Sequence, residues 1–69
     1  MPKGTVKWFS AQRGYGFIVP DDGGADTFVH ISTVERAGLA GLNEGQRVEY
    51  ELNRDKGRRV SAANLRSAE

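Results

Sequence analysis

The chain has 69 residues, a formal net charge of +1 and no cysteine. A chain this short forms one domain that buries only about 60% of its extended surface, and without cysteine it has neither disulfides nor thiolate-bound metal. No apolar run approaches the ~20 residues of a membrane span and no signal peptide is evident at the N-terminus, so we expect a soluble cytoplasmic protein with one domain, residues 1–69.

Basic side chains gather in two stretches of the chain. Residues 1–20 carry three cations and no acid, and residues 54–66 carry five cations and one acid. A closed sheet that brings both stretches to one side would attract a polyanion although the net charge is near zero. Charge alone, however, favours the simpler interpretation of an ordinary solvated surface.

Residues 4–9 predict a first strand, because they are rich in β-branched and aromatic side chains. Strict alternation places Trp8 on the same side as Val6, the natural core residue. Two arrangements remain open: Trp8 covers an edge of the core, or a β-bulge turns it to the other face. Taken alone, a single tryptophan in a small domain is more often a core residue than a ligand contact.

Residues 13–20 predict a second strand, joined to the first by a short polar hairpin loop. Tyr15 and Phe17 alternate with two glycines and Ile18, so we expect Ile18 to pack inward and the two rings to stay partly exposed. The alternative is a core strand with both rings buried. The segment fits the first five positions of the RNP1 pattern K/R-G-F/Y-G/A-F, which favours an RNA-binding surface.

Residues 27–31 predict a third strand, after a strong turn at residues 20–24. Phe28 and His30 share one side of this strand, and Val29 lies on the other. In an antiparallel meander the ring-bearing faces of the second and third strands coincide. We therefore expect one ring-lined platform made of Tyr15, Phe17, Phe28 and His30.

The rest of the chain predicts one helical turn and two more strands. Ser32 is the expected N-cap of the turn, with Glu35 three residues later, and a glycine soon ends it. Residues 46–52 alternate with Val48, Tyr50 and Leu52 inward, and residues 59–65 form a fifth strand after a charged turn at 53–57. Together these elements predict an all-β fold, a five-stranded antiparallel Greek-key barrel of the OB-fold class with a single helical turn after strand 3.

Four segments of the chain, residues 4–9, 13–18, 26–32 and 42–46, resemble the bacterial cold-shock proteins. The similarity runs from about residue 3 to residue 65, and the second and third segments look like that family's RNP1 and RNP2 signatures. The resemblance implies an OB-type barrel that binds single-stranded RNA and DNA. It also implies a nucleic-acid chaperone that affects transcription antitermination and translation by keeping strands from pairing with themselves.

The resemblance also implies the binding residues. The family's nucleotide-binding positions fall on Lys7, Trp8, Tyr15, Phe17, Phe28 and His30. Arg13 takes a place that the family usually gives to lysine, and Asp26 matches a carboxylate that hydrogen-bonds a base. For Trp8, the family places the ring on the binding face rather than in the core.

The chain departs from the family at two ring positions. Ile31 and Leu39 stand where many members have aromatic residues, so we expect them to contribute less to binding. Each lost ring removes up to about 1–3 kcal/mol of stacking per base, although aliphatic side chains still cover part of a base. Arg58 and Arg59 are candidates for compensating phosphate contacts.

Other classes of function fit the sequence less well. One histidine, no cysteine and no convincing nucleophile argue against an enzyme, a metal site, a cofactor or a small-molecule substrate. An RRM needs two real helices and a longer chain. The remaining alternative is an SH3-like barrel whose rings bind a proline-rich peptide. The expected partners are thus single-stranded RNA and DNA, bound by a monomer, with no membrane partner.

Overall fold

The computed structural model describes residues 2–54 and 60–68 of the chain, with the side chain of residue 54 left aside. Its elements are β1 (Lys3–Ser10), β2 (Tyr15–Pro20), β3 (Thr27–His30), α1 (Ile31–Arg36), β4 (Arg47–Arg54) and β5 (Val60–Ser67). Within these residues no helix is long and apolar enough to cross a membrane.

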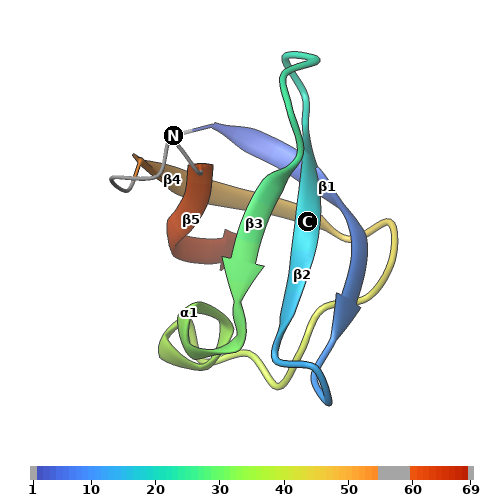
Figure 1. The fold of residues 1–69 in the computed structure, drawn as a ribbon, viewed down its shortest axis with the longest axis vertical. Helices are drawn as coiled ribbons and strands as arrows, with labels where there is room; N and C mark the ends of the chain where they lie inside the picture. Colours follow the sequence, from blue (N-terminus) through green and yellow to red (C-terminus); the bar gives the residue numbers. More distant parts are fainter. Residues whose placement is uncertain (1, 55–59, 69) are drawn as a thin grey trace.

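The strands close into a barrel in the order β1-β2-β3-β5-β4, which confirms the predicted fold class. Every pairing is antiparallel except the one between β3 and β5, which is parallel and links Phe28 to Ser61. In Figure 1, β1, β2 and β3 lie side by side, and α1 follows the end of β3 and contacts β5. Closure leaves these short strands without a long open edge.

A β-bulge in β1 decides the orientation of Trp8. Val6 is opposite Ile18 of β2, and Trp8 is opposite the neighbouring residue, Phe17, so Lys7 is an extra residue on β1 without a partner position on β2. This extra residue shifts the in–out alternation of the following side chains by one position. Val6 is therefore buried in the core, and Trp8 lies on the outer face beside Phe17.

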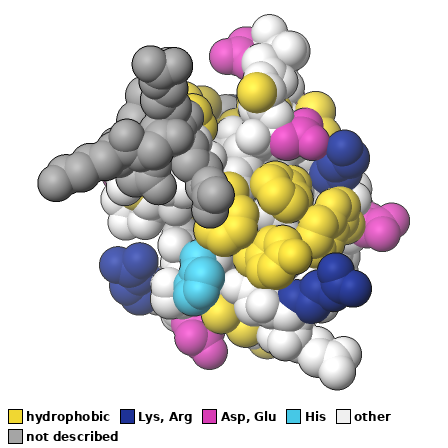
Figure 2. All heavy atoms as spheres, viewed as in Figure 1, with side chains coloured by type: hydrophobic (Ala, Val, Ile, Leu, Met, Phe, Trp, Pro, Cys, Tyr) yellow, Lys and Arg dark blue, Asp and Glu magenta, His cyan; other side chains and the backbone are white. Residues whose placement is uncertain are grey.

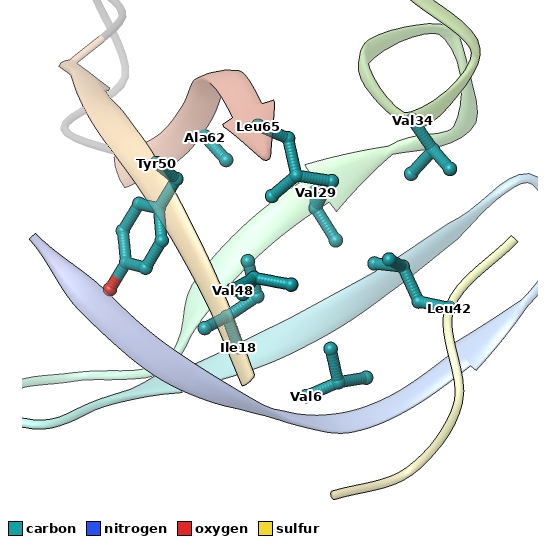
Figure 3. Packing of buried hydrophobic residues seen from close by; sticks show 9 residues of the cluster. All are labelled: Val6, Ile18, Val29, Val34, Leu42, Val48, Tyr50, Ala62 and Leu65. Atoms are coloured by element: carbon teal, nitrogen blue, oxygen red, sulfur yellow. The ribbon is translucent and has the colours of Figure 1, made fainter. Parts of the chain in front are cut away.

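The core lies inside the barrel and beneath α1. Figure 3 shows its side chains pointing toward one another from the strands, the helix and the loop before β4. The predicted inward positions Ile18 and Val29 are fully buried, and Leu39 packs against the cluster from outside it. The buried members are Val6, Ile18, Val29, Val34, Leu42, Val48, Tyr50, Ala62 and Leu65.

Four expectations about the elements are wrong. Leu52 was expected inward but is 50% exposed, because the register between β4 and β5 shifts between Tyr50 and Leu52. The third strand ends at His30, so Ile31 begins α1, and His30 rather than Ser32 is the N-cap residue. The fifth strand runs on to Ser67, and most of the predicted turn at 53–57 lies outside the described residues.

A bidentate ion pair ties the turn after β2 to β4. The guanidinium of Arg47 donates to both carboxylate oxygens of Asp21 at 2.6 Å, and to the hydroxyl of Thr5 on β1 at 3.0 Å. The hydrogen bond from Arg47 lowers the pKa of Asp21 below its ordinary value of 3.8. Both side chains are more than a third exposed, so solvent screens the pair and its contribution is small.

Replacing Asp21 by asparagine is expected to remove a pH-dependent part of the stability. Since the pKa of Asp21 is lower in the folded state, the carboxylate stabilises the fold above its unfolded pKa, and this stability is lost as pH falls through the folded pKa. Urea unfolding at pH 7 and at acid pH measures this effect. The difference in the free energy of unfolding between Asp21→Asn and the native chain should become smaller in acid. Glu44→Gln, at an exposed position, is the control. Identical curves for Asp21→Asn and the native chain would contradict the role of this pair.

Candidate nucleic-acid interface

Five rings lie together on the outer face of β1, β2 and β3, and we call them the aromatic platform. The strand register places Trp8, Phe17 and Phe28 in one row across the three strands. Ring centroids are 5.4 Å apart between Trp8 and Phe17 and 5.8 Å apart between Phe17 and Phe28. A second row pairs Tyr15 with His30, and Tyr15 stacks on Phe28 at 5.6 Å.

The platform is open to solvent although its rings pack on one another. Trp8, Tyr15, Phe17 and Phe28 are partly buried, and His30 is exposed. Figure 2 shows a continuous hydrophobic area with lysine or arginine side chains at its margin and the histidine beside it. Contiguous apolar surface of this kind marks a binding site in a small protein. The grouping of rings predicted from β2 and β3 is thus present, with Trp8 added by the bulge.

Lys7 and Asp26 are joined at one edge of the platform. The ammonium of Lys7, at the bulge, donates to a carboxylate oxygen of Asp26 at 3.0 Å, just before β3. In the free protein each of these two predicted contacts therefore already has a partner of opposite charge. Arg13 lies in the exposed turn between β1 and β2, where its backbone N–H donates to the hydroxyl of Ser10.

His30 does two things at once. Its Nδ1 accepts the backbone N–H of Ser32 at 3.1 Å and lies 2.9 Å from the hydroxyl of the same residue, which caps α1. A nitrogen that accepts an amide proton carries none itself, so in this arrangement the proton is on Nε2. The capped ring is exposed, and its centroid lies 6.5 Å from that of Phe28.

The other predicted nucleic-acid contacts, at Ile31, Leu39, Arg58 and Arg59, fall into three groups. Ile31 is half-buried at the start of α1, and its backbone N–H donates to the carbonyl of Gly14. Leu39 is partly buried against the core. Arg58 and Arg59 lie outside the described residues.

One residue of this region, Arg36, was not singled out from the sequence. It shares a groove with Phe28 and His30. The available signal was its position in the last turn of a helix that begins beside His30.

Comparison with known proteins shows the family of this chain. A family model described as the 'Cold-shock' DNA-binding domain matches residues 2–68. The chain is 60% identical to a probable cold shock protein, y4cH, of Sinorhizobium fredii, over 97% of this chain and 99% of that one. It is 58% identical to cold shock protein CspA of Rhizobium meliloti, over 99% and 100% of the two chains.

A third relative is more distant. The cold shock-like protein CspE of Escherichia coli is 53% identical over 91% of this chain and 90% of its own. The family match, the two near full-length relatives and the closed barrel with its platform of rings all point the same way. The chain belongs to the cold-shock domain family, whose members bind nucleic acid and are not enzymes.

Proposed function

We propose that this protein binds single-stranded RNA and DNA across the aromatic platform and acts as a nucleic-acid chaperone. The observation that carries the proposal is the row of rings left on the outer face of β1, β2 and β3. Every base has a π-face, and stacking on an aromatic side chain contributes about 1–3 kcal/mol per base without selecting a sequence. The expected contacts are Lys7, Trp8, Arg13, Tyr15, Phe17, Asp26, Phe28 and His30.

The ion pair at the platform edge gives binding its polar component. A strand that lies over Trp8 brings a phosphate and a base edge to Lys7 and Asp26, which are 3.0 Å apart in the free protein. The ammonium then contacts the phosphate, and the carboxylate accepts a hydrogen bond from a base N–H. In the free protein the ammonium of Lys7 is already paired with Asp26, and this pair must break before Lys7 contacts a phosphate. The phosphate contact therefore contributes less binding free energy than it would with an unpaired lysine, which favours moderate affinity.

Moderate affinity suits a chaperone. A strand whose bases are turned toward the platform cannot pair with itself, so binding shifts hairpins toward their open form without ATP. Fast release then lets the strand find its final pairing. Acting in this way as a cytoplasmic monomer on nascent transcripts and messenger RNA, the protein would promote transcription antitermination and translation.

An RNA hairpin with a fluorophore and a quencher on its two ends tests the proposal. We expect the native protein to raise the fluorescence without ATP, because it captures the single-stranded form. A variant with both Phe17→Ala and Phe28→Ala should leave the hairpin closed. An unchanged signal at protein concentrations that saturate oligothymidine would contradict the chaperone role while leaving strand binding in place.

The fluorescence of Trp8 separates this function from that of a peptide-binding barrel. Because Trp8 lies 5.4 Å from Phe17 on the open face, a stacked base is expected to quench it. Quenching by hexathymidine and not by a proline-rich peptide supports the proposal. The reverse result would identify the platform as a peptide groove.

A further inference from the structure

A groove continues the aromatic platform beyond its His30 end. Phe28 and His30 form one wall, and the groove runs between α1 and the strands β4 and β5. Its volume is about 390 Å³, within the range of ligand-binding sites in proteins. A strand that leaves the last ring of the platform on this side therefore enters a concave surface.

The topology of the barrel keeps this groove open. β3 and β5 are paired at Phe28 and Ser61, and β3 ends two residues later, where the chain turns into α1. The hydroxyl of Thr33 on α1 donates to the carbonyl of Ala62 at 3.4 Å, which joins the helix to the floor of the groove. Ala62 and Ala63 are small, so no long side chain of β5 fills the space.

The charge of the groove comes from Arg36. Its Nε donates to the carbonyl of Ser32 at 3.4 Å, which leaves both terminal nitrogens for a ligand. Among the described residues that line the groove none carries a carboxylate, and within residues 2–54 and 60–68 no ion pair of Arg36 is found, in contrast to Lys7 with Asp26. A guanidinium without a carboxylate partner, on a polar surface, suits the oxygens of a phosphate.

We propose that this groove binds the sugar and phosphate of one further nucleotide, next to the base that stacks on Phe28 and His30. Arg36 contacts the phosphate, and Ser32 and Asn53, which also line the groove, offer a hydroxyl and an amide to the sugar. This inference rests on the proposed binding of single strands by the platform. It extends the strand's path over the surface to α1 and β5, neither of which carries a platform ring.

Arg36→Ala tests the groove with heptathymidine as the probe. We expect affinity to fall by about 3- to 10-fold, as for the loss of one phosphate contact, and the slope of log affinity against log salt to decrease by about 0.7. Arg66→Ala is the matched control: its exposed guanidinium lies on β5 outside the groove, 3.6 Å from Glu49, and its loss should change neither quantity.

Ala63→Leu fills the groove without changing the charge. This variant should also weaken the binding of heptathymidine, and in the native protein the backbone amide signals of residues 61–63 should shift when the strand is added. If Ala63→Leu does not fold, Arg36→Ala still decides, because its side chain is exposed.

Two results separate the groove from the platform. If Arg36→Ala keeps the native affinity and salt slope while Phe28→Ala binds more weakly, the proposal that the groove binds a nucleotide is wrong. The proposal that the platform binds the strand then stands. If the native protein binds no oligothymidine at all, both proposals fall together.

Discussion

Phe28→Ala is expected to weaken the binding of hexathymidine by about 5- to 150-fold while the barrel stays folded, because one stacked base contributes about 1–3 kcal/mol. Phe28 is at the centre of the platform, with Phe17 at 5.8 Å, Tyr15 at 5.6 Å and His30 at 6.5 Å. Its removal thus takes away one stacking surface and loosens three others. Phe17→Ala, in the same row, should act in the same direction.

Val19→Ala is the control for the ring substitutions. Val19 is on the same face of β2 and is 40% exposed, but it is not a ring. We expect its loss to leave affinity nearly unchanged. Affinity comes from titrating Trp8 fluorescence, and folding from far-UV circular dichroism. Native affinity in Phe28→Ala would contradict the proposal that bases stack on the platform. A chain that unfolds when this partly exposed ring is removed would show that the ring serves the fold instead.

Gly16→Ala is expected to destabilise the fold by about 2–3 kcal/mol, a large part of the stability of so small a domain. A Cβ atom on Gly16 would clash with the carbonyl oxygen of Trp8 and lie 2.7 Å from the Cα of Phe9. Both atoms belong to the backbone of β1, so the clash is relieved only by moving the two strands apart. Because these strands carry Trp8 and Phe17, the platform would be disrupted as well.

Gly41→Ala is the matched control for this clash. A Cβ at Gly41, in the loop before β4, would meet no atom of the described residues within 4 Å. Urea unfolding followed by Trp8 fluorescence should give a much lower midpoint for Gly16→Ala and a nearly native one for Gly41→Ala. Equal midpoints would mean that β1 and β2 tolerate a methyl group between them, contrary to their spacing.

Much of the site was predictable from local patterns. The alternation in β2 and β3 depends on the strand geometry of each segment alone, so Tyr15 and Phe17 were correctly placed opposite Ile18, and Phe28 opposite Val29. The turns and the five strands followed from residue types with strong backbone preferences.

Other features depended on neighbours distant in the sequence. The alternation within β1 left Trp8 undecided, and only its register against β2 shows that Lys7 is an extra residue. The same limitation made the prediction for Leu52 wrong, because the shift in β4 is set by its pairing with β5.

The sequence by itself therefore determined the fold class and the rings that share a face on β2 and β3, since periodicity and residue type are local properties, and the resemblance of four segments to the cold-shock proteins indicated the family. Only the tertiary structure decided the bulge at Lys7, the capping of α1 by His30, the pairing of Lys7 with Asp26 and the groove at Arg36. The bulge, the ion pair and the groove join groups that are distant in the sequence, and the cap depends on where β3 ends. The geometry of the first three is fixed by how the strands pair and pack, which no local pattern encodes.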